Sequence, residues 1–323
     1  MSGQLRIING ATIRRLAPPE KLIGWMREAM IAVSRREVEL PLRRAIVLPG
    51  GMGAIGIMPG YVGAEANSAG VKLVSLVPPE RRKGSSHLGL MVLYDADGLV
   101  PEAILCGGTV TAIRTSAATA NATDLLARKD ATKLTILGSG EQAAAHIDAL
   151  RVVRPIDDVR IWGVNQDNAQ RLAIEKGGRS CKTVEEALDG ADIVCTVTAA
   201  SEPILFGRQL ADGMHVNLVG SSFPDKREVD DEVVTKSRFF IDYLPSTLDQ
   251  AGEFLHARET GLVTDNHILG EIGAVATGEI TGRQSDADIT VYKSLGVAAQ
   301  DIMTARRVFE LACSAGLGTL ANI

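Results

Sequence analysis

The 323-residue sequence has few cysteines. The four present, Cys106, Cys181, Cys195 and Cys313, lie far apart, with no Cys-x-x-Cys pair and no histidine at metal-ligand spacing. This pattern argues against a disulfide framework and predicts no metal site. We expect free thiols in a reducing, cytoplasmic compartment.

The sequence also lacks an excess of positive charge. Lysine and arginine number 34 against 39 for aspartate and glutamate, which gives a net charge of −5 and an isoelectric point near 5.6. Binding to nucleic acid through phosphate neutralisation usually needs the opposite balance, so we do not expect nucleic acid as a partner. The N-terminal residues show no basic segment leading into an apolar one, so no secretory signal is predicted.

No uncharged run has the composition of a membrane helix. The longest, residues 45–64, reaches the 20 residues that a spanning helix needs. It contains six glycines and two prolines, which disfavour a continuous helix. We predict turns and short strands there, and no membrane partner.

Two regimes of periodicity divide the chain. Residues 20–38 have the spacing of an amphipathic helix, and residues 43–105 form short β-rich runs, at 45–48, 71–77 and 88–94. After a helix predicted at 111–128, strands alternate with helices, which indicates βαβ units and a parallel sheet. The last helix, 297–312, either closes this second domain or returns to the first. The predicted strands lie at 134–137, 159–162, 193–198, 214–219 and 239–243, and the helices between them include 141–153 and 168–176.

A glycine motif joins the first strand of the second regime to its helix. Gly138-Ser139-Gly140-Glu141-Gln142-Ala143 matches G-x-G-x-x-A in the strand-to-helix context that dinucleotide binding requires. Gly138 is expected to make the tight turn, and Gly140 to let a pyrophosphate approach the helix N-terminus. A ligand-free glycine turn is the alternative. The motif therefore predicts a nicotinamide cofactor.

The choice between NAD and NADP depends on the end of the second strand. Gly163 occupies the place of the acidic residue that binds the ribose hydroxyls in NAD proteins, and no arginine follows to bind a 2′-phosphate. Asn165 is able to bond a ribose hydroxyl, so NAD is favoured over NADP.

Cationic side chains in the first domain suit a small anionic substrate. Arg43 and Arg44 precede a strand, and Arg114 is expected in the first turn of the helix at 111–128. Each of these arginines has the simpler interpretation of a solvated charge. Lys72 lies between Val71 and Leu73 on an alternating strand, so its side chain points either to solvent or to a cleft. In a cleft, burial and nearby arginines would lower its pKa and suit it to proton transfer.

Over nearly its whole length the sequence resembles the ornithine cyclodeaminase/mu-crystallin family. The resemblance implies an α/β fold, with a Rossmann dinucleotide-binding domain at 121–299 and an α+β substrate-binding and dimerisation domain at 1–120 and 300–323. It also implies a homodimer and a small 2-imino acid or amino acid as ligand. The segments that carry it are 41–43, 57–59, 71–74, 85–87, 111–118, 138–143, 219–228 and 290–296.

The same resemblance implies roles for individual residues. Arg43, Lys72 and Arg114 contact the substrate carboxylate, Lys72 is also the catalytic group, and Leu295 lines the substrate pocket beside the nicotinamide. The positions that match cofactor contacts are Ser86, Thr115, Glu141, Gln142, Thr198, Lys226 and Ser294.

One departure from the family separates its activities. Ornithine cyclodeaminases carry an aspartate two residues before the proline that is Pro224 here, and this chain has Ser222. A serine hydroxyl cannot act as an ionised base near neutral pH. We therefore expect a reductase of 2-imino acids, such as a cyclic ketimine or iminosuccinate. The alternative is an ornithine cyclodeaminase with tightly bound NAD, in which Asp225 replaces the missing residue; a non-catalytic nucleotide-binding protein is disfavoured by the three cations together.

Two further features remain open from the sequence. His87 is either a proton shuttle or a structural histidine, and the basic run 81–83 is either an attractor for a second carboxylate or a solvated loop.

Overall fold

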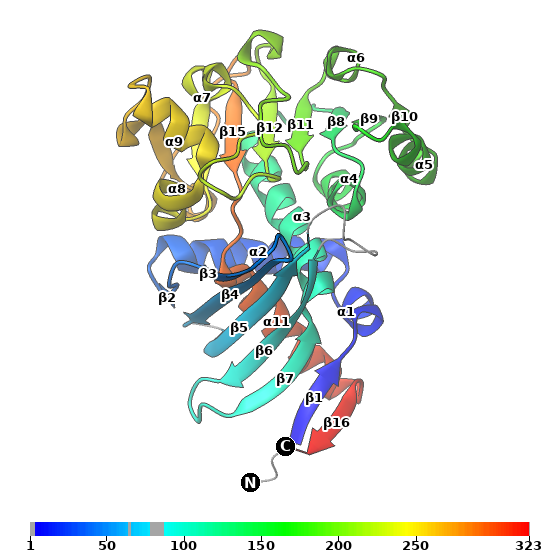
Figure 1. Cartoon of the computed structure of the whole chain (residues 1–323), viewed down its shortest axis with the longest axis vertical. Helices are drawn as coiled ribbons and strands as arrows, with labels where there is room; N and C mark the ends of the chain where they lie inside the picture. The colour runs from blue at the N-terminus through cyan, green and yellow to red at the C-terminus, as the bar shows by residue number, and fades with distance from the viewer. Residues whose placement is uncertain (1–3, 64–65, 78–86, 323) are drawn as a thin grey trace. The chain divides into compact units, whose positions relative to one another are not determined.

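The computed structural model describes residues 4–63, 66–77 and 87–322. The chain divides into two compact units, the first comprising Met1–Thr115 and Gly296–Ile323 and the second comprising Ser116–Leu295. Each unit has its own sheet (Figure 1). Among the described residues, no helix combines the length and the apolar composition that crossing a bilayer requires.

The sheet of the first unit is mostly antiparallel. Its strand order is β16-β1-β7-β6-β5-β4-β2, β3 pairs with β4, and only β1 and β7 among these described neighbours run parallel. The strands are β1 (Gln4–Ile8), β2 (Val38–Glu39), β3 (Arg44–Leu48), β4 (Gly53–Val62), β5 (Ser68–Leu76), β6 (His87–Asp95), β7 (Pro101–Cys106) and β16 (Thr319–Asn322).

One face of this sheet is covered by α11, which packs on β4, β5 and β6 and also on α2. Alternate residues of β5 are buried on this face, including Lys72. The last predicted helix, α11, thus belongs to the first unit. The helices of this unit are α1 (Gly10–Leu16), α2 (Pro19–Ser34), α11 (Ala298–Ser314) and the start of α3 (Gly107–Leu126).

Three predictions about helices and strands were wrong. The helix predicted at 20–38 ends at Ser34, because Arg36 has a φ of 60° and the chain then enters β2. The helix predicted to begin at 111 begins at Gly107, which places Arg114 in the body of α3 rather than in its first turn. The run 45–64 holds a strand of 10 residues, β4, rather than only short strands. Its Gly60 is suited to this place, since a Cβ there would lie 3.0 Å from the Cβ of Ala298 in α11.

All strands of the second sheet run parallel, in the order β10-β9-β8-β11-β12-β15-β13-β14. The order reverses between β8 and β11, which is the switch point where doubly wound sheets bind nucleotides. The predicted α/β fold with a Rossmann-type sheet is therefore confirmed. The strands are β8 (Lys133–Leu137), β9 (Asp158–Trp162), β10 (Arg179–Ser180), β11 (Ile193–Thr196), β12 (His215–Leu218), β13 (Arg238–Ile241), β14 (Ile268–Glu271) and β15 (Thr290–Lys293).

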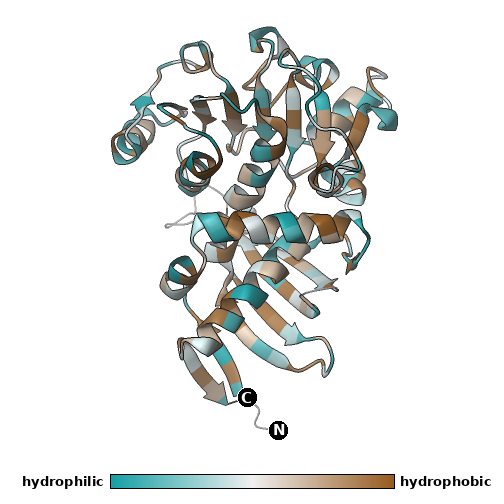
Figure 2. Ribbon diagram, turned by 180° about the vertical axis from the view of Figure 1, so that it is seen from behind, coloured by the Kyte–Doolittle hydropathy of each residue, from teal (hydrophilic) through white to brown (hydrophobic). Residues whose placement is uncertain are grey.

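Hydrophobic residues predominate in β8, β9, β11 and β13 (Figure 2). They are buried because a parallel sheet with helices on both faces has no solvated side. The helices are the end of α3 with α4 (Glu141–Val153), α5 (Gln166–Lys176), α6 (Val184–Leu188), α7 (Asp231–Lys236), α8 (Leu244–Gln250), α9 (Gly252–Glu259) and α10 (Ile272–Ala276), and two 3₁₀ turns lie at Gly207–Gln209 and Asp265–His267.

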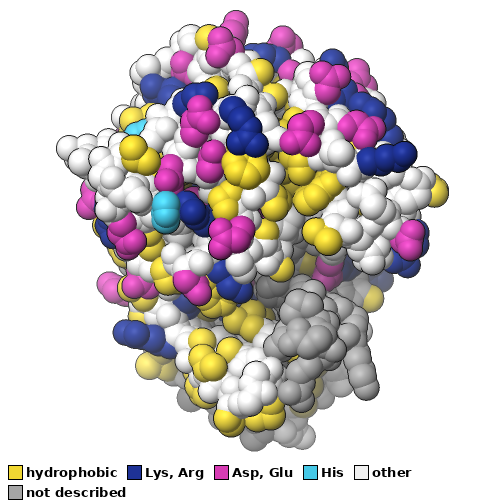
Figure 3. Space-filling view, turned by 45° about the horizontal axis from the view of Figure 1, so that its top comes forward, with side chains coloured by type: hydrophobic (Ala, Val, Ile, Leu, Met, Phe, Trp, Pro, Cys, Tyr) yellow, Lys and Arg dark blue, Asp and Glu magenta, His cyan; other side chains and the backbone are white. Residues whose placement is uncertain are grey.

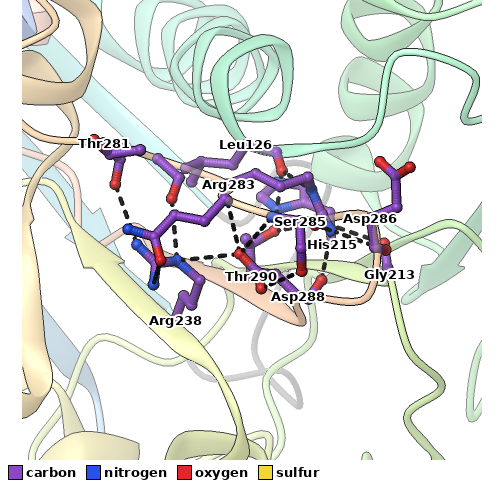
Figure 4. Close-up of polar contacts among 12 residues, drawn as sticks. Leu126, Gly213, His215, Arg238, Thr281, Arg283, Ser285, Asp286, Asp288 and Thr290 are labelled. Carbon is purple, nitrogen blue, oxygen red and sulfur yellow. Dashed lines mark hydrogen bonds and ion pairs between the residues drawn. The ribbon is translucent and has the colours of Figure 1, made fainter.

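Arg283 fixes the segment that leads into β15 (Figure 4). Its guanidinium donates to the carbonyls of Leu126, Gly213 and Asp288, and to the hydroxyl of Thr290. These bonds satisfy backbone acceptors that belong to no strand pair. Arg238 also donates to the carbonyls of Thr281 and Gly282, so two arginines hold the segment that leads into β15. Acidic and basic side chains are interspersed on the part of the surface drawn in colour in Figure 3.

Candidate active site

The glycine motif forms the turn between β8 and α4. Gly138 has a φ of 135°, and a Cβ at this position would lie 2.8 Å from the carbonyl oxygen of Val197. Gly140 is the N-cap of α4, and a Cβ there would meet no described atom within 4 Å. Gly138 is therefore required by the turn, whereas Gly140 leaves open space over a helix N-terminus, where unsatisfied N–H groups favour an anion.

The predicted cofactor residues of the second unit gather at one edge of its sheet, where the strands have their carboxyl ends. We call this the carboxyl edge. Glu141 and Gln142 follow β8, Asn165 follows β9, Thr198 follows β11, Lys226 lies in the segment after β12, and Ser294 follows β15. These five strands are neighbours in the sheet.

Two buried polar atoms at the carboxyl edge fit a bound nucleotide. Within the described part of the chain, neither the hydroxyl of Ser294 nor the side-chain oxygen of Gln142 has a hydrogen-bond partner. A buried polar atom without a partner is costly, so native sites usually supply one from a ligand or from water. The residues present therefore fit the predicted nicotinamide cofactor.

Other predicted cofactor residues are already bonded within the protein. The hydroxyl of Thr198 donates to Glu228 and accepts from the amide of Ala200. The side-chain oxygen of Asn165 accepts from the amide of Asn168 and caps α5. Thr115, in the first unit, donates its hydroxyl to the carbonyl of Thr111 in the same helix. Ser86 and the basic run 81–83 lie outside the described residues.

A buried carboxylate that the sequence analysis did not select joins two loops of the carboxyl edge. Glu228 is fully buried, and its carboxylate accepts from both the amide and the hydroxyl of Thr198, each at 2.7 Å. It also accepts from the hydroxyl of Thr196 and from the amides of Gly220 and Ser221. Burial raises the pKa of Glu228, and the bonds from Thr196 and Thr198 act in the opposite direction. The loops after β11 and β12 are thus held on one side chain.

A buried ion pair supports the next strand end. Lys293 Nζ lies 2.9 Å from Glu253 Oε2 and donates to the carbonyl of Ser221 at 2.7 Å, with both charged side chains fully buried. Lys293 immediately precedes Ser294, so this pair fixes the backbone that carries the Ser294 hydroxyl.

In the first unit, two of the predicted substrate residues meet at one carboxylate. Lys72 Nζ lies 2.8 Å from Asp301 Oδ2, and Arg114 Nε donates to Asp301 Oδ1 at 2.9 Å. We call Lys72, Arg114 and Asp301 the Lys72 cluster. All three are buried, which excludes the simpler interpretation of Arg114 as a solvated charge.

Burial lowers the pKa of Lys72 to about 8. The charges of Arg114 and Arg43 act in the same direction, whereas Asp301 raises the pKa of Lys72. Such a lysine exchanges its proton near neutral pH, as a general acid or base must. Arg43 precedes β3 and is close enough to Lys72 to lower its pKa. Leu295, the other predicted substrate residue, packs in the apolar core of the second unit.

Sequence reasoning missed Asp301 and Glu228. Asp301 carried a usable signal, because it is an acidic residue on the apolar stripe of the predicted helix at 297–312, three residues after Ala298 and four before Ala305. Glu228 lies in a segment that carries the family resemblance, but its type and spacing alone indicated no role.

Known proteins resemble this chain along most of its length. The chain is 34% identical over 273 residues to the ketimine reductase mu-crystallin of Mus musculus, with 84% of each protein covered. It is 33% identical over 321 residues to the Delta(1)-pyrroline-2-carboxylate reductase of Bacillus cereus, with 97% of this chain and 98% of that protein covered.

A solved structure agrees with these relatives. The Delta(1)-pyrroline-2-carboxylate reductase of Thermococcus litoralis, in complex with NADH and L-proline, superposes with a TM-score of 0.93 at 30% identity, covering 98% of this chain and 99% of that one. The family model of the ornithine cyclodeaminase/mu-crystallin family matches residues 11–316. The chain therefore belongs to the ornithine cyclodeaminase/mu-crystallin family.

Proposed function

We propose that the protein is a nicotinamide-dependent reductase of small 2-imino acids, which converts a C=N bond to the amine of an amino acid. The observation that carries this proposal is the Lys72 cluster, in which a buried lysine with a pKa of about 8 lies beside a buried arginine. The relatives point the same way, because they are reductases of a ketimine and of Delta(1)-pyrroline-2-carboxylate.

We assign substrate binding to the first unit and cofactor binding to the second. The cofactor would be held by Gly140, Glu141 and Gln142 at the N-terminus of α4, and by Asn165, Thr198, Lys226 and Ser294 along the rest of the carboxyl edge. Ser86 and Thr115 are proposed as further contacts. When bound in its reduced form, the cofactor supplies a hydride.

NAD is the proposed cofactor rather than NADP. The residues directly after β9, from Gly163 to Asp167, include no cation that would pair with a 2′-phosphate. The side-chain oxygen of Asn165 caps α5, so its side-chain nitrogen is the atom that would donate to a ribose hydroxyl. An acidic residue in the first turn of α5, Asp167, also disfavours a further phosphate there.

In the proposed mechanism, Arg43 and Arg114 bind the substrate carboxylate and orient the C=N carbon. Charge-assisted bonds of this kind fix both position and angle. Lys72, as an ammonium group, protonates the imine nitrogen through Nζ and so increases the electrophilic character of the carbon. In the reverse direction, neutral Lys72 accepts the proton from the amine. Leu295 is proposed to line the substrate pocket.

A reductase is favoured over an ornithine cyclodeaminase. Ser222 stands at the position of the cyclodeaminase aspartate, and its hydroxyl is not an ionised base near neutral pH. Asp225, the potential substitute, is exposed to solvent.

We also propose that the protein is a homodimer formed through the first unit. Ile46 pairs with Ile55 across β3 and β4, and Leu73 pairs with Leu90 across β5 and β6. Together with Leu88, these residues form an apolar patch on one face of the sheet. Each of the five residues is 37% to 55% exposed. An apolar surface of several large side chains on one face favours a protein partner, and a second copy of the chain is the simplest one.

The direct test follows reduced-nicotinamide absorbance with purified protein, with NADH and NADPH assayed separately. Delta(1)-pyrroline-2-carboxylate and other 2-imino acids are the substrates, and L-ornithine with NAD is assayed in parallel for proline and ammonia. We expect stoichiometric consumption of NADH with at least one imino acid. Formation of proline and ammonia from ornithine, without any imino-acid-dependent oxidation, would establish the cyclodeaminase instead.

Lys72→Ala provides the matched test of the mechanism. We expect turnover to be abolished while NADH still binds, because Lys72 is not one of the residues proposed to hold the cofactor. Lys129→Ala is the control, since the Lys129 side chain is 78% exposed. A Lys72→Ala enzyme with nearly full activity would refute the assigned role.

A further inference from the structure

Asp301 contacts two different cations with its two carboxylate oxygens. It lies in the first turn of α11 and is fully buried. Oδ2 contacts Lys72 from β5, and Oδ1 accepts from Arg114 in α3. One carboxylate of α11 therefore holds a side chain of β5 and a side chain of α3.

Arg114 has a second contact with α11. Its Nη1 donates to Gln300 Oε1 at 2.7 Å, and Nε donates to the adjacent Asp301 at 2.9 Å. Two neighbouring acceptors determine the plane of the guanidinium as well as its position, because its donors form a rigid fork. Gln300 is itself fixed, since its Nε2 donates to the Sδ of Met30 in α2. The orientation of Arg114 is thus set before any substrate binds.

The charges around Lys72 do not cancel. Within the Lys72 cluster, Lys72 of β5 and Arg114 of α3 are two cations, and Asp301 of α11 is the one carboxylate between them. The positive end of α11 adds to the stabilisation of the Asp301 carboxylate. A cluster with more cations than carboxylates is costly when buried, and a substrate carboxylate balances it.

We propose that Asp301, supported by Gln300, is a positioning residue of the active site, which holds the Lys72 ammonium and the Arg114 guanidinium as one preformed site for a 2-imino acid. Asp301 acts through these two side chains and does not touch the substrate. This inference rests on the proposed reductase function and assigns a role to α11 within it.

The proton on Lys72 gives this role a specific signature. Burial, Arg114 and Arg43 lower the pKa of Lys72, and Asp301 raises it. Removal of the Asp301 charge therefore lowers this pKa further, so that Lys72 loses its proton at a lower pH. Imine reduction needs this proton, so the activity of the wild-type enzyme should decrease above the pKa of Lys72. Without the Asp301 charge, the same decrease should occur at a lower pH.

The experiment compares the wild-type enzyme with D301N in imine reduction, with kcat/KM measured as a function of pH. An opposite charge within contact distance moves a pKa by about 1 to 3 units. We expect the inflection on the alkaline side to move to lower pH by that amount, and KM for the imino acid to rise about 10- to 100-fold. The dissociation constant of NADH should not change.

E102Q is the control, because Glu102 pairs with Arg306, another residue of α11, at 2.6 Å. It removes a carboxylate of β7 that pairs with α11 and leaves Lys72 and Arg114 unchanged, so the inflection in E102Q should equal that of the wild type. An inflection in D301N that stays at the wild-type pH overturns the proposal, even when the activity is low.

Q300M separates orientation from charge. It keeps Asp301 and removes only the second contact to Arg114, so KM should rise about tenfold with the inflection unmoved. If D301N fails to fold, an unchanged KM in Q300M overturns the proposal. Failure of the function itself is distinguishable, since then the wild-type enzyme consumes no NADH with any imino acid.

Discussion

At the scale of single residues, the Lys72 cluster depends on a glycine. Gly296 directly precedes the segment that leads into α11 and has a φ of 76°. A Cβ at this position would lie 2.5 Å from Arg114 Nη1 and 2.8 Å from Nη2. The backbone of residue 296 therefore lies against the edge of the guanidinium, and this close approach is possible only without a side chain.

Gly296→Ala should displace Arg114. We expect KM for the imino acid to rise about tenfold or more, because small displacements of an orienting group are costly to the reaction. Gly278→Ala is the control, since Gly278 has a similar φ of 79° but a Cβ there would meet nothing within 4 Å. Both variants should lose about 1 to 3 kcal/mol of stability from backbone strain. Equal KM values in the two variants would show that contact with Arg114 is unimportant.

At the scale of elements, the carboxyl edge is organised by side chains that lie between strands. Glu228 joins the loops after β11 and β12, and the Lys293–Glu253 pair fixes the end of β15. The strands bring these loops to one edge, but the buried charges determine how their backbones lie. The geometry of the proposed nucleotide site is therefore a property of three loops together.

Glu228→Gln should loosen two of these loops. The side-chain nitrogen of glutamine would face the amide of either Thr198 or Gly220, which bond to different carboxylate oxygens, so at least one hydrogen bond is lost. We expect a loss of about 1 to 3 kcal/mol in the free energy of unfolding and about tenfold weaker NADH binding. Thermal unfolding and fluorescence titration measure the two effects. Glu232→Gln, which removes an exposed pair with Lys236, is the control and should leave both unchanged.

The elements themselves were predictable where one period of hydrophobicity dominates. The helix predicted at 141–153 agrees with α4, and the alternation of strands and helices gave the parallel sheet. Boundaries failed where a local backbone preference ended a helix, as at Arg36. Lys72 was selected from its place on a strand, but its burial was not predictable, because the helix that covers it, α11, is more than 200 residues away in the sequence. Asp301 was visible as an acidic residue on the apolar stripe of a predicted helix, but its contacts with Lys72 and Arg114 were not predictable for the same reason.

At the scale of the whole molecule, the second unit contains two histidines that are buried in the neutral form. Burial lowers the pKa of His146 to about 4 and that of His215 to about 3, against an ordinary value of 6.5. The unfolded chain therefore binds protons more readily than the folded one as the pH falls from 6.5 toward these values. Stability is fully present above pH 6.5 and is lost on acidification.

We expect each of these histidines to cost about 2 kcal/mol of stability between pH 7 and pH 5. Urea unfolding at the two pH values measures the difference. His146→Gln should reduce the pH dependence by the share that His146 contributes. A pH dependence that His146→Gln leaves unchanged would contradict the assignment.

The apolar face of the first unit gives a prediction about assembly. Leu90→Glu places a charge among the residues of the proposed dimer interface, and Leu90 is 47% exposed in the single chain. We expect the molecular mass by sedimentation to fall from that of two chains to that of one. Val164→Glu, at a 91% exposed position of the second unit, is the control. A wild-type protein that sediments as a single chain would refute the proposed homodimer.

The first unit is interrupted in the sequence, since Ser116–Leu295 stands between its two parts. During synthesis the ribosome completes the whole second unit before it reaches Asp301, and domains generally fold as units while the chain emerges. Until then Lys72 and Arg114 have been made without the carboxylate that joins them. The nascent protein is thus expected to acquire the sheet of its second unit first, and to complete the Lys72 cluster only when α11 docks.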